Sequence, residues 1–140
     1  MADLIDGIAR HLHALGLVTY DPTGVTGDCF AEVQPAQPDS IVTLTLYGGA
    51  PIDSKLPYDT PSLQVRTRGG PDPRTSRTRA QALYEELNGL GPVTLPDGSR
   101  LLLAVANQTP TFMGQDSTGR CEHTCNFSLE VHAPSVHRPA

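Results

Sequence analysis

Residues 62–69 read Ser-Leu-Gln-Val-Arg-Thr-Arg-Gly, and apolar and polar side chains alternate along them. A two-residue period is typical of a strand that buries one face in a core. The inward positions are Leu63, Val65 and Thr67. The outward positions are Gln64, Arg66 and Arg68. We expect this outer face to present an amide and two guanidinium groups, which donate directed hydrogen bonds and suit a docking surface.

Outward from this strand, hydrophobic periodicity predicts a helix on either side of it. The first covers roughly residues 2–15, where the apolar side chains form one stripe. The second begins after Asp72, with Pro73 at its first position, and ends near Gly89. Further strands are predicted at 29–33, 41–47, 100–106 and 121–132, with shorter extended pieces at 93–95 and 108–115.

The order of these elements predicts an α+β fold. We expect a mostly antiparallel sheet of about five to six strands, with the two helices packed on one face. The apolar run at 100–106 indicates a strand buried on both faces. Residues 1–132 would form one domain, and residues 133–140, which carry two prolines and no apolar pattern, would form a flexible tail.

Composition limits the classes of function. A chain of 140 residues is normally one domain, and its net charge of −5 argues against a protein that wraps duplex DNA. It contains no apolar run of about 18 residues and no signal-peptide pattern, so we expect neither membrane insertion nor secretion. Three cysteines are an odd number, which favours reduced thiols in the host cytoplasm during synthesis.

The segment Cys121-Glu-His-Thr-Cys125 offers metal-ligating side chains around His123, and Cys29 lies elsewhere. On a straight strand the two cysteines are about 13 Å apart, at about 3.3 Å per residue. Both sulfurs therefore cannot reach one tetrahedral zinc ion, whose ligand atoms lie within about 2.3 Å. A His–Cys pair with Cys29 could still converge, but small buried cysteines are the favoured interpretation. We expect no metal and no cofactor.

Catalytic motifs are also missing from the sequence. It has no Gly-x-Ser-x-Gly elbow, no phosphate-binding glycine-rich loop and no His-Glu-x-x-His. His123 and Cys125 would stand side by side on one strand face without a third group to orient them. The acidic residues are scattered, with no pair at a spacing that demands acid–base catalysis. We expect a protein that is not an enzyme.

Five of the ten basic residues fall within 14 positions of this acidic chain. They are Arg66, Arg68, Arg74, Arg77 and Arg79. One interpretation is a solvated face paired loosely with local carboxylates. Nucleic acid is another candidate partner, but no aromatic platform accompanies the arginines. A charged seam that matches an acidic patch on another subunit fits the net charge better.

Residues 48–61 form the longest stretch without periodicity, and loops of this length are commonly functional or mobile. Leu56 and Tyr58 give it apolar content that a solvated linker would not need. Two interpretations stay open: a proline-stiffened loop folded back on its own domain, or an arm that packs on a neighbouring subunit. Residues 115–120 are predicted to form a hairpin loop.

Several short motifs, in this order and spacing, resemble the minor capsid and tail-terminator proteins of tailed bacteriophages. They are Tyr47-Gly-Gly-Ala-Pro51, Pro61-Ser-Leu-Gln-Val-Arg-Thr-Arg-Gly69, the helix from Ala80 to Leu90, Gln108-Thr-Pro-Thr-Phe-Met-Gly-Gln-Asp116, Gly119-Arg120 and Asn126-Phe-Ser-Leu-Glu-Val131. The resemblance extends from the first helix to His132. The Cys121/Cys125 strand and the arginine-rich start of the second helix depart from the pattern.

The resemblance implies a structural virion protein. Such proteins form a ring, commonly of six subunits, that stops the tail tube and meets the head connector or neck protein. DNA would pass through the ring lumen only transiently. A ring needs a heterologous interface between two different patches of each subunit. The candidate contact residues are Gln64, Arg66, Arg68, Arg74, Arg77, Leu56, Tyr58, Gln115, Asp116 and Arg120. The alternatives are a neck stopper or adaptor, and a Cys/His metal-binding domain.

Overall fold

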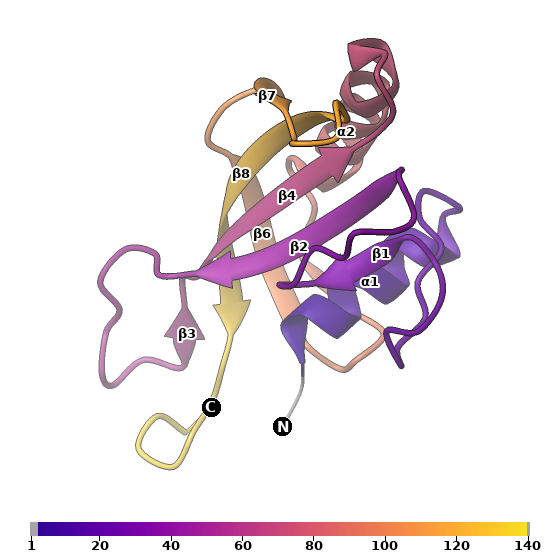
Figure 1. Cartoon of the computed structure of the whole chain (residues 1–140). Coiled ribbons are helices and arrows are strands. Elements are labelled where there is room, and N and C mark those ends of the chain that lie inside the picture. Colours follow the sequence, from indigo (N-terminus) through magenta and orange to yellow (C-terminus); the bar gives the residue numbers. More distant parts are fainter. Residues whose placement is uncertain (1–2, 140) are drawn as a thin grey trace.

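A computed structural model describes residues 3–139, and its longest strand, β8 (Cys121–His132), forms the centre of the sheet (Figure 1). Two helices and seven further strands of these residues surround it. The elements are α1 (Leu4–Ala14), β1 (Cys29–Ala31), β2 (Ile41–Tyr47), β3 (Tyr58–Asp59), β4 (Ser62–Arg68), α2 (Pro73–Leu87), β5 (Val93–Thr94), β6 (Arg100–Ala106), β7 (Thr111–Gln115) and β8.

Both edges of β8 are occupied along its length. On one edge β4 pairs with residues 122–128 and β3 pairs with residues 131–132. On the other edge β7 pairs with residues 121–124 and β6 with residues 127–132. The strand order is β1-β2-β4-β8-β6-β5, and the curved sheet forms a half-barrel (Figure 1). Strand β8 therefore connects the end of the sheet that carries β7 with the end that carries β3.

Local signals position the two helices where the sequence predicted them. Asp3 accepts a hydrogen bond from the Asp6 amide and begins α1, and residue 2 of the predicted range lies outside the described residues. Asp72 accepts a hydrogen bond from the Arg74 amide and begins α2, with Pro73 at its first turn. Side-chain oxygens at these positions satisfy helix amides that have no partner within the helix.

The core lies on one face of the sheet, between the sheet and the two helices. The apolar stripe of α1 and the buried face of α2 join the inward side chains of β2, β4, β6 and β8 in one cluster. Its largest members include Ile8, Leu12, Leu44, Leu83 and Phe127. Burial of such side chains contributes roughly 1.5–3 kcal/mol each. The predicted α+β class, with both helices on one core, is confirmed in this coarse form.

The sheet is mostly antiparallel, as predicted, and among residues 3–139 the parallel pairing is that of β1 with β2. It differs from the prediction in two respects. Within residues 3–139 it contains eight strands instead of five or six, because the short strands β3 and β5 pair with longer neighbours. Strand β6 is buried on one face only, so the prediction of burial on both faces is wrong: Leu101 and Ala104 are buried, whereas Leu103 and Val105 are exposed.

The C-terminal segment, predicted to be a flexible tail, makes hydrogen bonds with the rest of the chain through Arg138. Ser135 and Arg138 form an isolated bridge, which turns the chain back. The Arg138 guanidinium donates to the carbonyl oxygens of Leu56 and Tyr58 and to the carboxylate of Asp59. The segment therefore holds the end of the long loop against β8.

Candidate assembly surface

The outer face of β4 lies opposite the core, and it carries two of the predicted contact residues, Gln64 and Arg66. Both are half-buried. Arg66 Nη2 donates to Glu122 Oε2 at 2.6 Å, and Gln34 Nε2 donates to Glu122 Oε1 at 2.6 Å. The Glu122 carboxylate is buried, so these two donors satisfy it where water cannot. Arg66 is therefore a structural ion-pair partner, although 38% of its side chain stays exposed.

Arg68 differs from the prediction that it faces solvent. Only 3% of the residue is exposed, and its guanidinium donates to the carbonyl oxygens of Ala36, Pro38 and Asp39. Residues 36–39 thus cover the end of the outer face where we expected a free guanidinium. Burial, followed by the charge of Arg120, lowers the Arg68 pKa. Arg68 holds a loop in place and offers no donor to a partner.

The start of α2 presents the other predicted arginines. Arg74 is exposed and pairs with the capping Asp72 at 3.1 Å. Arg79 points inward and pairs with Asp28 at 2.8 Å. Arg77 is exposed, and among residues 3–139 no carboxylate lies within ion-pair distance of it. The interpretation of pairing with local carboxylates therefore holds for Arg66, Arg74 and Arg79, but not for Arg68 or Arg77.

The hairpin between β7 and β8 contains Gln115, Asp116 and Arg120. The Asp116 carboxylate accepts hydrogen bonds from the Thr118 and Arg120 amides and from Arg120 Nε. The hydrogen bond from the Arg120 amide is the main cause of its lowered pKa, and the side chains of Thr118 and Arg120 add to it. Arg120 also donates to Asp39, so little of its charge remains for a partner. Gln115 remains exposed.

The long loop 48–61 folds back on its own domain. Thr60 Oγ1 donates to the Ala50 carbonyl oxygen at 3.2 Å. A β-carbon at Gly49 would collide with the Thr60 carbonyl oxygen, so the close approach of the two loop ends requires glycine. Tyr58 stacks at an angle on His132, with 5.6 Å between the ring centroids. The end of the loop at Tyr58 thus contacts its own domain, as the folded-back interpretation predicted. Residues 48–56 are exposed, with Leu56 at 54%, so an arm that packs on a neighbouring subunit stays a prediction.

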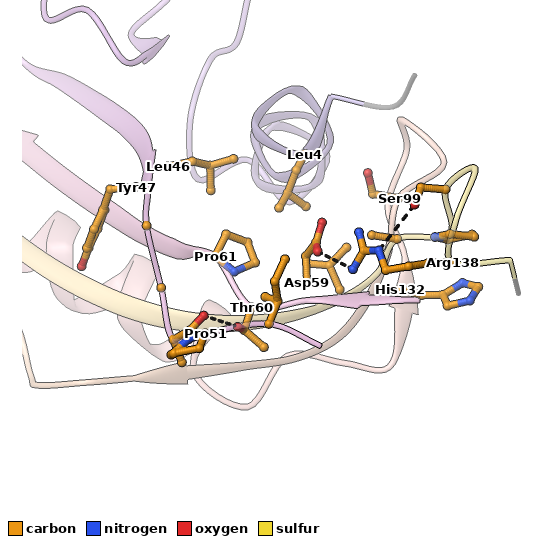
Figure 2. A pocket seen from close by; sticks show the side chains of 18 residues that line it. Leu4, Leu46, Tyr47, Pro51, Asp59, Thr60, Pro61, Ser99, His132 and Arg138 are labelled. Atoms are coloured by element: carbon orange, nitrogen blue, oxygen red, sulfur yellow. Dashed lines mark hydrogen bonds and ion pairs between the residues drawn. The ribbon is translucent and has the colours of Figure 1, made fainter. Parts of the chain in front are cut away.

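The folded loop forms one wall of an apolar groove of about 770 Å³. Figure 2 shows Leu4 of α1 on one side of it and Pro51, Thr60 and Pro61 of the loop on the other. The ion pair between Asp59 and Arg138 lies at one end. The sequence predicted the loop but not the groove, because α1, the end of β8 and the C-terminal turn reach this place only through the fold.

A second apolar feature lies on β7. Phe112 and Met113 are each 53% exposed. The pairing register with β8 shifts between Phe112 and Gly114, so Met113 occupies an irregular position with no assigned partner on β8. A bulge of this kind turns a side chain away from the direction it would have in a regular pair of strands. We call Phe112 and Met113 the β7 knob. They belong to a motif of the sequence resemblance, but their exposure gave no signal in the sequence.

The sulfur-bearing strand is part of the core. Cys29, Cys121 and Cys125 are free and buried, as the favoured interpretation predicted. Burial raises the pKa of the Cys125 thiol to about 11 and that of Cys29 to about 12. His123 Nδ1 lies 2.7 Å from Ser76 Oγ. No group of three His, Cys, Asp or Glu side chains in residues 3–139 is placed to hold a metal ion.

The fold and its surfaces define a small α+β half-barrel whose polar outer face, folded loop and exposed β7 knob surround one core. A family model described as bacteriophage tail terminator protein matches residues 11–132, and the chain belongs to that family. The match covers the end of α1 and all eight described strands. No curated protein matches the chain. None of the helices in residues 3–139 could span a membrane.

Family membership makes the chain a phage tail terminator protein, a virion component that interacts with other virion proteins. The sequence resemblance is confirmed at this level.

Proposed function

We propose that the protein forms a closed ring, with six subunits, that ends the tail tube and joins it to the head connector. The match over residues 11–132 carries this proposal. A ring needs two different surfaces on each subunit. The chain offers an apolar groove beside loop 48–61 and an exposed aromatic side chain on β7.

The protein acts in this proposal by binding alone, with no bond made or broken. The arrangement of its reactive groups supports that view. Burial raises the pKa values of the Cys29 and Cys125 thiols, which disfavours the thiolate that attacks substrates. The Ser76–His123 pair is buried beneath α2, where a substrate has no access to the hydroxyl. Assembly would take place in the host cytoplasm, with DNA crossing the ring lumen only transiently.

Tube capping tests the proposal. The purified chain is added to polymerising tail-tube protein, and tube length and tube ends are measured by negative-stain electron microscopy. We expect shorter tubes with density at one end, and six copies of the chain by native mass spectrometry. Tubes of unchanged length without bound chain would contradict a terminator. Binding to the connector but not to the tube would assign the protein to the neck instead.

A matched pair of variants separates surface effects from folding. Leu56→Asp adds a charge to the exposed loop beside the groove, and we expect it to abolish capping. Val25→Asp adds the same charge at a residue that is 80% exposed in a different loop, and we expect it to cap normally. Because both residues are exposed, both variants should keep the wild-type melting temperature.

A further inference from the structure

We propose that the β7 knob of one copy docks in the apolar groove of the next copy, and that this contact closes the ring. The inference rests on the proposed function, because it names the surfaces through which the ring subunits meet. Phe112 and Met113 supply the inserted side chains. The groove beside loop 48–61 receives them.

The groove is suited to bind an apolar side chain. Leu4, Leu46, Pro51 and Pro61 line it (Figure 2), and so does Val131. The Arg138 contacts hold the loop in position, and the Thr60–Ala50 hydrogen bond fixes its other end. A preformed site costs less ordering entropy when a partner binds. An aromatic anchor in such a pocket is the usual centre of a protein interface.

The β7 knob is held rigidly on the sheet. The Phe112 ring packs at an angle against His123, with 5.3 Å between the ring centroids. His123 is fixed in turn by Ser76 of α2. More than half of the Phe112 and Met113 surface nevertheless remains exposed to water. Transfer of the exposed half of these two side chains from water into an apolar groove would favour binding.

Charges beside the two features complement each other. Arg77 lies near the β7 knob, since its positive charge acts on His123, and it has no carboxylate partner in the described chain. The groove is lined by Asp59, whose carboxylate pairs with Arg138. Two more acidic residues, Asp3 and Asp53, are exposed and adjoin in sequence the lining residues Leu4 and Ile52. A second copy of this chain therefore fits the groove in charge as well as in apolar character.

The two features cannot meet within one chain. Phe112 pairs with His123 near the start of β8, whereas Val131 and His132 line the groove at its end. Eight residues of extended strand separate His123 from Val131, which is about 26 Å at about 3.3 Å per residue. Figure 1 shows β7 and the C-terminal turn at opposite ends of β8. The contact is therefore between copies. Repeated head to tail from one copy to the next, it is heterologous, which is the type of contact that closes rings.

A cysteine pair tests the contact directly. Phe112→Cys and Ile52→Cys are combined in one chain, and the three native thiols stay in place because they are buried. Mild oxidation with copper phenanthroline should give a covalent ladder of the double variant that reaches the ring number. Each single-cysteine variant should give no ladder beyond a dimer. A double variant that assembles but gives no ladder would overturn the inference.

Complementary variants test the direction of the contact. Phe112→Ser with Met113→Ser removes the β7 knob and leaves the groove intact. Ala50→Arg fills the groove and opposes Arg77 by charge, while the β7 knob stays intact. Each variant alone should remain monomeric, and an equimolar mixture should stop at a dimer with one contact. Rings formed by either variant alone would contradict the inference, as would a mixture that stays monomeric although both variants are folded by circular dichroism.

The wild-type chain separates this inference from the proposed function. If it caps tail tubes and the variants without the β7 knob cap them equally well, the contact is wrong and the function stands. If the wild-type chain caps no tubes but gives the covalent ladder, the contact stands and the terminator function fails.

Discussion

Arg68 and Arg120 donate hydrogen bonds to the same acceptor, the carbonyl oxygen of Ala36. Two guanidinium groups repel each other at this spacing, and the charge of Arg120 contributes to the lowered pKa of Arg68. Asp39 and Asp116 offset that repulsion by pairing with Arg120. These hydrogen bonds hold the segment around Ala36 against β4 and against the β7–β8 hairpin. The segment therefore covers the outer sheet face at the Arg68 end of β4.

Replacing Arg68 with methionine tests this structural role. The substitution removes the charged donor from the carbonyl oxygens of Pro38 and Asp39, while Arg120 still donates to Ala36. Because a hydrogen bond from a charged group contributes about 1.5–3 kcal/mol, we expect Arg68→Met to lower the free energy of unfolding by about 3 kcal/mol. Urea denaturation measures the loss. Arg77→Met is the control and should change stability by less than about 0.5 kcal/mol, since Arg77 is exposed. Equal stability of the two variants would contradict the structural role.

The ion pair between Arg66 and Glu122 is the second testable contact. Glu122 is buried and depends on Arg66 and Gln34 for its hydrogen bonds. We expect Glu122→Gln and Arg66→Met to be coupled by about 1 kcal/mol in a double-mutant cycle, since the arginine remains partly exposed to water. The cycle is measured by chemical denaturation. A coupling of zero would show that the pair contributes nothing to folding.

Periodicity predicted the faces of β4 but not what covers them. Leu63 and Val65 enter the core as the alternation required. Arg68 has the same alternation as Arg66, yet it is buried, because residues 36–39 lie over it. No local pattern connects a loop to a strand about 30 residues later in the chain. The alternation within a strand therefore does not predict whether a distant loop covers its polar face.

The candidate surface shows the same limit. Leu56 and Tyr58 were predicted as contact residues because apolar side chains are unusual in a long loop. The groove beside them was not predicted, since its walls come from both ends of the chain, at Leu4 and Arg138. Strand β6 was misread because Leu103 and Val105 are apolar but exposed. An apolar run in a sequence predicts burial. The same run occurs where apolar side chains lie on an exposed sheet face, as Leu103 and Val105 do.

Cysteine labelling provides a third prediction. All three thiols are buried, and burial raises the pKa values of Cys29 and Cys125, so their thiolates are scarce near neutral pH. We expect fewer than one thiol per chain to react with Ellman's reagent within minutes at pH 8. All three should react at once in 6 M guanidinium chloride. Rapid labelling of the native protein would show that the strand carrying Cys121 and Cys125 is open to solvent.

The pH dependence of stability should report on His123. Burial is the main cause of its lowered pKa, and the positive charge of Arg77 adds to it. The unfolded chain therefore binds a proton at His123 near pH 6.5, whereas the folded chain binds it only at lower pH. The unfolding free energy contributed by this group is fully present above pH 6.5 and is lost as the pH falls toward the folded pKa. Ser76 and the Phe112 ring are the other groups that contact His123.

We therefore expect the wild-type protein to lose stability between pH 7 and pH 5, measured by urea denaturation at each pH. His123→Gln should flatten this part of the profile, because the variant lacks the imidazole whose pKa is lowered in the folded chain. Arg77→Gln should reduce the slope without removing it, since burial remains the larger cause of the shift. His137→Gln is the matched control, because His137 is exposed, and it should leave the slope unchanged. If all four proteins gave the same slope, the loss at low pH would arise from carboxylates and not from His123.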